Sequence, residues 1–117
     1  MPRISIPALD QTPAATVPLL DAVKKQLGVV PNLMKVVGNS PAALGGYLAL
    51  NGALAKGALG AKTGERIALT IAEINACRYC LAAHTYLGRN VAKLDDAEIA
   101  ANRNGASNDP RADAAVR

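Results

Sequence analysis

The hydrophobic residues of this sequence are almost all small or aliphatic, which restricts the folds that it can form. The chain contains no phenylalanine and no tryptophan, and its only aromatic residues are Tyr47, Tyr79 and Tyr86. Hydrophobic residues make up 50% of the 117 positions, and they are mainly Ala, Leu, Val and Ile. Such side chains let helices approach closely but bury little area each. We therefore expect one thin-cored domain over residues 1–117 that gains much of its stability from subunit contacts, as a homo-oligomer.

Charge and hydropathy argue against two classes of partner. The net charge is +4, and the basic residues are scattered without interleaved aromatic residues, so we expect a solvated surface and no nucleic-acid binding. No stretch reaches the roughly 18 consecutive apolar residues of a transmembrane helix, and the N-terminus lacks the apolar core of a signal peptide. The sequence therefore predicts a cytoplasmic protein with no membrane partner. In that reducing compartment a cysteine pair is expected to cycle between dithiol and disulfide.

Proline and glycine positions divide the first part of the chain. Residues 1–18 contain four prolines and no sustained period, which predicts an extended arm. Residues 19–27 and 33–37 carry apolar residues at helical spacing, and each stretch ends at a glycine. We expect two short helices there, joined by a turn, at the start of a core that extends to about residue 103.

Two longer helices are predicted next. Ser40 and Pro41 form a start signal, because Ser favours the capping position and Pro is tolerated in the first helical turn. That helix should end near residues 57–60 and pack through one stripe, namely Leu44, Tyr47, Leu48, Asn51, Leu54, Ala55 and Ala58. After Gly60, apolar residues continue with a helical period as far as Ile74. Gly60 or Thr63 is the expected cap of this second helix.

Both cysteines and the only histidine lie within eight residues, at Cys77, Cys80 and His84. In a helix these three residues point within roughly 60° of one another. Cysteines at that spacing can close a disulfide, and an imidazole one turn beyond can hold or pass a proton. Taken singly, each residue is more often structural. Two cysteines that both fall in one C-x-x-C motif favour redox or metal chemistry instead.

Metal and haem fit this cluster poorly. A zinc site needs four ligands, and the sequence offers only three Cys and His side chains, so zinc would require a carboxylate, a second chain or an open position. Covalent haem attachment needs a histidine directly after the second cysteine, whereas residues 81–83 intervene here. We therefore expect neither a metal nor a cofactor.

Two carboxylates are candidate partners for the histidine, and the choice depends on Asn75. In an unbroken helix Glu65 and Cys77 would lie about 18 Å apart along the axis and point about 120° apart. A break near Asn75 would start a new helix at the cysteines, fold it back, and place the thiols near a helix N-terminus, which favours thiolate. Glu73 lies one turn before Cys77 and would share its face if the helix continued.

The spacing of Glu65, Cys77, Cys80 and His84 resembles a known family signature: a Glu, eleven residues, C-x-x-C, three residues and a His. The chain resembles the carboxymuconolactone decarboxylase superfamily, and within it the alkylhydroperoxidase D-like, peroxidase-related branch. The resemblance covers about residues 29–110, and its flanking motifs are Pro31-Asn32-Leu33-Met34, Ser40-Pro41 and the run from Ala72 to Gly88.

The resemblance implies an all-α helical bundle that assembles as trimers or hexamers and reduces hydroperoxides with thiols. It implies that Cys80 attacks the hydroperoxide and that Cys77 then resolves the sulfenic acid to a disulfide. His84 would take the thiol proton, and Glu65, favoured over Glu73, would support the imidazole. The reductant would be a dithiol, such as a lipoyl protein or a thioredoxin-like protein.

Two positions depart from the family pattern. Tyr79 stands where the founding alkylhydroperoxidase D has a histidine. The tyrosine hydroxyl would either donate a hydrogen bond to a bound peroxide, or the side chain would only line the site. The chain ends at Arg117, shortly after a predicted helix start at 109–111, where relatives continue through further helices. The C-terminal end therefore looks truncated, or a partner covers the remaining core surface.

Three other functions remain open at this point. The C-x-x-C motif also suits a general dithiol-disulfide oxidoreductase. A lyase like the decarboxylase branch is a further reading, although those relatives generally lack the cysteine pair. The last is a non-enzymatic module that binds metal or serves in assembly.

Overall fold

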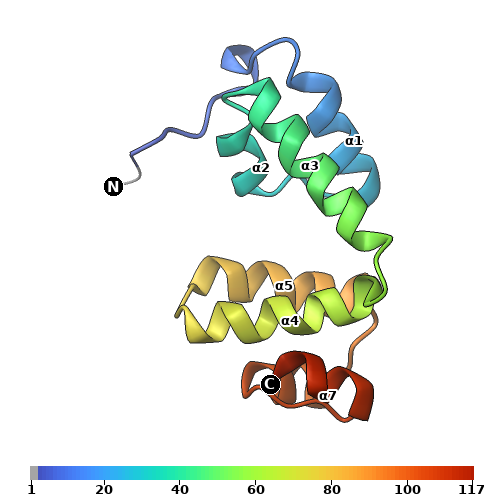
Figure 1. The fold of residues 1–117 in the computed structure, drawn as a ribbon. Coiled ribbons are helices and arrows are strands. Elements are labelled where there is room, and N and C mark those ends of the chain that lie inside the picture. The colour runs from blue at the N-terminus through green and yellow to red at the C-terminus, as the bar shows by residue number, and fades with distance from the viewer. Residues whose placement is uncertain (1–2) are drawn as a thin grey trace. The chain divides into compact units, whose positions relative to one another are not determined.

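The regular elements of the structure, a computed structural model that describes residues 3–117, are all helices (Figure 1). This confirms the expected helical class. None of the helices in the described part is long and apolar enough to cross a membrane. The elements are the 3₁₀ turn η1 (Leu9–Gln11) and the helices α1 (Val17–Leu27), α2 (Asn32–Val37), α3 (Pro41–Ala55), α4 (Gly60–Ile74), α5 (Arg78–Asn90), α6 (Asp96–Arg103) and α7 (Pro110–Val116).

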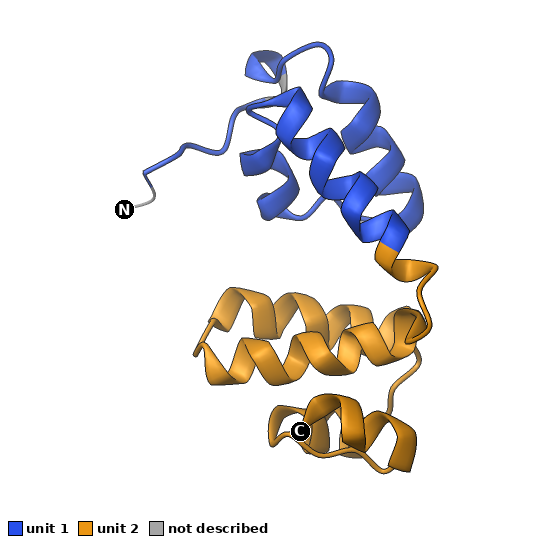
Figure 2. Cartoon of the chain, in the orientation of Figure 1, with its two compact units in different colours: residues 1–53 blue, residues 54–117 orange. Residues whose placement is uncertain are grey.

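The helices form two compact units, residues 1–53 and residues 54–117 (Figure 2). The first unit holds α1, α2 and most of α3, and the second holds α4 to α7. Each unit is described by itself below. The expectation of one domain over the whole chain stays a prediction.

In the first unit, the residue before α1 packs closely against the end of α2. Thr16 is fully buried, and its Oγ1 donates a hydrogen bond to the carbonyl of Gly38 over 2.7 Å. A Cβ at residue 38 would lie 2.7 Å from the Thr16 methyl group, so only glycine fits there. The helix α1 begins at Val17, before the expected residue 19, because Pro18 is accommodated in its first turn.

The N-terminal segment is less extended than the sequence suggests. The first two residues of the expected arm lie outside the described residues. Beyond them, the 3₁₀ turn at 9–11 and the early start of α1 interrupt the extended chain that was expected as far as residue 18. The Asn39 side chain donates a hydrogen bond to the carbonyl of Ser5 over 3.1 Å. The segment is therefore tied to the turn that follows α2.

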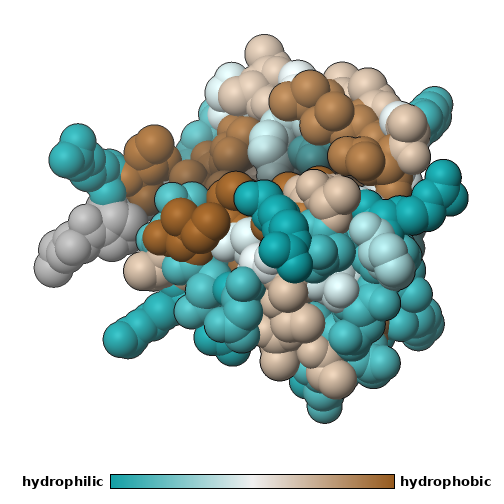
Figure 3. Space-filling view, turned by 60° about the horizontal axis from the view of Figure 1, so that its bottom comes forward, coloured by the Kyte–Doolittle hydropathy of each residue, from teal (hydrophilic) through white to brown (hydrophobic). Residues whose placement is uncertain are grey.

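The stripe predicted as the packing face of α3 is wrong for most of its length. Leu44 is fully buried and Leu48 is half-buried, but Tyr47 is 36% and Leu54 65% exposed, and residues 51–60 are all exposed. The physical reason is that α3 carries no charged residue and is apolar all round, so periodicity singles out no face. Hydrophobic residues accordingly remain in patches on the surface (Figure 3).

In the second unit, α4 packs against α5, α6 and α7, and it runs beside α5 (Figure 1). Leu69, Leu94 and Ile99 form the buried core. Gly88 is also buried, and a Cβ there would lie 3.4 Å from a methyl group of Leu94. Small residues thus allow the close helix contact that the composition predicts.

The helix break expected near Asn75 is confirmed. Helix α4 ends at Ile74, and Ala76 adopts the left-handed region at φ 50°. The amide of Cys77 then bonds to the carbonyl of Ala72 over 3.0 Å, and α5 starts at Arg78. The left-handed residue reverses the chain, so α5 returns along α4.

A buried carboxylate, Glu98, ties α4 to α6 and to the segment before α7. Its Oε1 accepts hydrogen bonds from Arg66 over 2.8 Å, from Asn102 over 3.0 Å and from the Ser107 hydroxyl, while the amide of Asn108 donates to Oε2 over 2.9 Å. Burial alone would raise the pKa of Glu98, but these hydrogen bonds and the charge of Arg66 outweigh it and lower the pKa to about 2.

The C-terminal helix begins as the sequence predicts. Asp109 occupies the capping position of α7, and its carboxylate accepts a hydrogen bond from the amide of Arg111 over 3.0 Å. Pro110 stands in the first turn. The capped start expected at 109–111 is therefore confirmed.

Candidate active site

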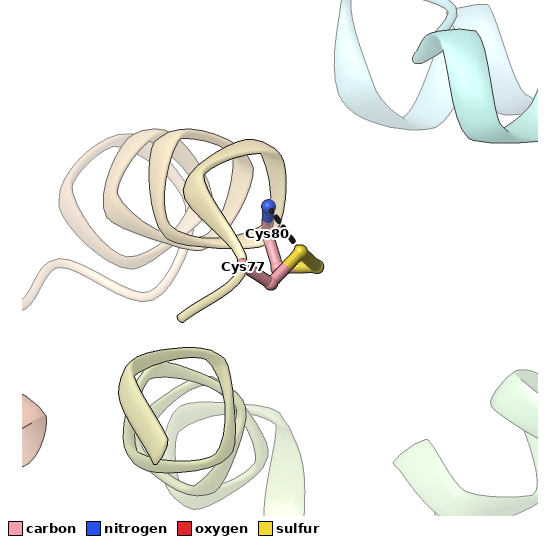
Figure 4. The surroundings of a disulfide bond; sticks show 2 residues. All are labelled: Cys77 and Cys80. Carbon is pink, nitrogen blue, oxygen red and sulfur yellow. Dashed lines mark hydrogen bonds between the residues drawn. A yellow bond between two sulfur atoms is a disulfide. The ribbon is translucent and has the colours of Figure 1, made fainter. Parts of the chain in front are cut away.

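The two cysteines lie in the first turn of α5 and are joined by a disulfide (Figure 4). Cys77 caps the helix with an extended backbone, and its Sγ accepts a hydrogen bond from the amide of Cys80 over 3.2 Å. Both residues are half-buried. A sulfur at a helix N-terminus with an N–H directed at it is held where a thiolate is stabilised.

His84 lies one turn further along α5, and it faces Glu65 from α4. Its Nδ1 is 2.8 Å from Oε2 of Glu65, and the two side chains are 32% and 22% exposed. The residues are 19 positions apart in sequence, and the reversal at Ala76 brings them together. Glu65, which was favoured over Glu73, is therefore the carboxylate that contacts the imidazole.

The contact with Glu65 decides which nitrogen of the imidazole is basic. An ionised carboxylate can only accept, so Nδ1 of His84 carries the hydrogen of this bond. In the neutral ring Nε2 then keeps its lone pair. The site therefore holds an oriented base whose free nitrogen faces away from Glu65.

Glu73, the rival carboxylate, is held elsewhere. Its Oε2 accepts a hydrogen bond from Nε of Arg103 in α6 over 2.6 Å, and this bond raises the pKa of Arg103. The break at Ala76 ends the helical continuity that would have placed Glu73 on the face of Cys77. Of the two candidates, Glu65 lies at His84 and Glu73 lies at Arg103.

Tyr79 stands between the cysteines on α5 and is 46% exposed. Its suggested hydrogen bond to a peroxide stays a prediction. Among the residues from 3 to 117, no group of three or more His, Cys, Asp or Glu side chains is placed to hold a metal ion.

Sequence reasoning missed two features of the second unit, and one of them, the left-handed residue Ala76, brings Glu65 to His84. Ala76 carries no signal for a left-handed backbone, since glycine or asparagine would be the usual residue there. The buried partnership of Arg66 with Glu98 was also missed, although Asp95 followed by Glu98 is a pattern typical of a helix start. Asp95 does cap α6, accepting the amide of Glu98 over 2.7 Å, while the Glu98 side chain turns inward to Arg66.

The model of the carboxymuconolactone decarboxylase family matches residues 41–117, which is more than half of the chain and includes all four residues of the candidate site. No curated protein matches the sequence significantly.

Proposed function

Since the chain belongs to the carboxymuconolactone decarboxylase family, which includes alkylhydroperoxidase D-like proteins, we propose that it is a thiol-dependent peroxidase that reduces alkyl hydroperoxides. The observation that carries the proposal is the hydrogen bond between Glu65 of α4 and His84, which lies on α5 one turn beyond the Cys77–Cys80 disulfide. A redox pair alone suits many thiol proteins, whereas an oriented base beside it suits the activation of a thiol for attack.

The proposed cycle starts from the reduced pair. Nε2 of His84 accepts the thiol proton of Cys80, directly or through a water molecule, and Glu65 stabilises the imidazolium. The Cys80 thiolate attacks the terminal oxygen of the hydroperoxide, the O–O bond breaks, and the alkoxide leaves. The alkoxide takes the proton back from the imidazolium and departs as an alcohol, while Cys80 becomes a sulfenic acid.

The second half of the cycle regenerates the dithiol. The thiol of Cys77 attacks the sulfenic sulfur of Cys80, which releases water and forms the disulfide. An external dithiol, such as a lipoyl group or a thioredoxin-like protein, then reduces the disulfide and is itself oxidised. In sum, one hydroperoxide and one dithiol give one alcohol, one water and one external disulfide.

Stoichiometric titration tests the redox step. One equivalent of hydroperoxide added to the reduced protein should convert two free thiols per chain into one disulfide, counted by thiol reagent and located by mass spectrometry. Peroxide consumption with the thiol count unchanged at two would contradict the dithiol mechanism.

Single cysteine variants assign the two roles. Cys80→Ser should abolish peroxide turnover, because the attacking sulfur is lost. Cys77→Ser should react once and leave a sulfenic acid at Cys80 that a dimedone-type reagent traps. The reverse pattern would exchange the roles of the two sulfurs.

A second candidate function is general dithiol-disulfide exchange with protein partners. It is favoured by the hydrogen bond from the Cys80 amide to Sγ of Cys77, because that contact stabilises a thiolate at the start of α5 whether or not a peroxide is present. The two functions are separated by the rates at which the reduced protein reacts with a disulfide-bonded peptide and with a hydroperoxide. Faster reaction with the peptide, unaffected by His84→Ala, would favour the exchange function.

A further inference from the structure

The first unit contains a cavity of about 630 Å³, within the range of about 300 to 1,000 Å³ that is usual for small-ligand sites. One wall is a face of α1 formed by Val17, Leu20 and Lys24, which recur three and four positions apart. The facing wall is the N-terminal segment through Ile6 and its neighbours. All residues that line the cavity belong to the first unit, so it is separate from the cysteine site.

The N-terminal wall is held by hydrogen bonds rather than by apolar packing alone. Asn39 donates to the carbonyl of Ser5 over 3.1 Å, immediately before the lining residue Ile6. The hydroxyl of Thr12 donates to the carbonyl of Ala8 over 3.1 Å, and both of these residues line the cavity. These hydrogen bonds fix the backbone of the segment that supplies this wall.

Apolar side chains in the cavity remain open to water. Ile6 is 46% and Val17 is 43% exposed, and both line it. Covering apolar surface contributes about 25 cal/mol for each Å² removed from water. An apolar ligand body would therefore be favoured between these two side chains.

The charges at the cavity favour a negative head group. Lys24 and Lys35 both line it, and neither side chain forms a hydrogen bond or ion pair with any residue in the described range. Lys35 is half-buried. The lining also includes one acid, Asp21, so the cavity keeps a net positive charge. An unpaired ammonium beside apolar surface is stabilised when an anion joins it.

We propose that this cavity binds a small amphipathic carboxylate of the medium-chain fatty acid class. The alkyl chain lies against Ile6, Val17 and Leu20, and the carboxylate lies between Lys24 and Lys35. This binding site is independent of the peroxidase proposal, because it uses none of the cysteine-site residues.

Three probes with the same alkyl chain test the head group. Decanoate, decanol and decylamine are titrated into the whole protein by calorimetry at low salt. Decanoate should bind saturably, one per chain, about three- to tenfold more tightly than decanol, and decylamine should bind more weakly than either. Equal affinities of the three probes, or tightest binding of decylamine, would overturn the proposal. It would also be overturned if decanoate did not saturate the protein below about 1 mM, the dissociation constant of a weak complex.

Matched variants test the location. Lys24→Met and Lys35→Met should each weaken decanoate binding about threefold and leave decanol binding unchanged, because Lys24 is exposed and Lys35 half-buried, so the charge contact that is lost is screened by water. Lys25→Met is the control, because Lys25 is adjacent, exposed and outside the cavity lining. Val17→Phe should weaken both ligands by filling the cavity. An equal loss in Lys25→Met, or no loss in Val17→Phe, would overturn the proposal.

Discussion

At the scale of single residues, His84 has the most demanding role proposed for this chain. A free thiol titrates near 8.5, so only a few per cent is thiolate at neutral pH. We predict that His84→Ala lowers the rate of Cys80 oxidation by about 10² to 10⁴ at pH 7, the usual range for general base catalysis. Much of the loss should return as the pH rises toward about 9, where the thiol ionises unaided.

The two glutamates provide the controls for that measurement. Glu65→Gln should give a smaller loss in the same direction, because it removes the support of the imidazolium. Glu73→Gln should be nearly silent, because Glu73 pairs with Arg103. Rates of oxidation against pH for the three variants decide the matter. A flat pH response in His84→Ala, or a larger defect in Glu73→Gln than in Glu65→Gln, would refute the relay.

The backbone at Ala76 allows a prediction about stability. An L-residue in the left-handed region costs about 1–2 kcal/mol, whereas glycine adopts that region freely but loses more entropy on folding. Ala76→Gly should therefore raise the free energy of unfolding by about 0.5–1 kcal/mol, measured by urea denaturation. Lys93→Gly is a matched comparison, because Lys93 also has a positive φ of 56°. A lower unfolding free energy in Ala76→Gly would contradict this account.

At the scale of helices, the Glu98 network predicts how acid weakens the second unit. The pKa of Glu98 falls from 4.5 to about 2 in the folded chain, so its contribution is fully present above pH 4.5 and is lost as the pH falls toward 2. The difference corresponds to about 3 kcal/mol of unfolding free energy. Denaturation curves between pH 6 and pH 2 should show this loss.

Variants connect that loss to Glu98 itself. Glu98→Gln should remove most of the pH dependence between pH 4.5 and 2. It should cost about 3–5 kcal/mol at neutral pH, because buried Arg66 keeps only the half-exposed Asp109, 3.6 Å from its Nη1, as a counter-charge. Glu73→Gln removes a half-exposed ion pair and should cost less than about 1 kcal/mol. Equal losses of unfolding free energy in the two variants would show that the burial of Glu98 does not increase its contribution to stability.

At the scale of the whole molecule, the exposed hydrophobic residues predict self-association. Leu50 and Leu54 are 59% and 65% exposed and lie one turn apart on α3, so they form a continuous apolar surface there, and Ile74 at the end of α4 is 74% exposed. We propose a homo-oligomer, a trimer or hexamer by the family resemblance. Light scattering at micromolar concentration should give a multiple of three chains, and a charged substitution at Leu50 should reduce the mass. A stable monomer would refute the proposal.

The sequence predicts where the helices of the second unit begin and end better than it predicts which residues of the first unit are buried. Caps and glycines mark most helix ends, because they satisfy or release backbone groups locally. The α3 stripe failed because Leu, Ala and Gly surround that helix, and an apolar residue on every side gives no preferred face. The exposure of Tyr47 and Leu54 depends on which other residues pack beside them. The periodicity of one helix gives no information about those neighbours.

The candidate site was predictable where local geometry determines it. One helical turn separates Cys77, Cys80 and His84, and the distance argument already required a break before Glu65 could approach the imidazole. The contact of Arg66 with Glu98 spans 32 positions and joins two polar residues, so neither hydrophobic pattern nor motif spacing indicates it. Such pairs become visible only once the helices are packed.

The short span of the Cys77–Cys80 bridge has a thermodynamic consequence. A crosslink stabilises a fold mainly by restricting the unfolded chain, and the effect grows with the length of the closed loop. This bridge joins residues only three positions apart, so its chain-entropy contribution is near the lower end, about 2 kcal/mol in that model. Opening and closing the bridge therefore changes the unfolded ensemble little. The helices can therefore remain folded in both oxidation states, as the proposed redox cycle requires.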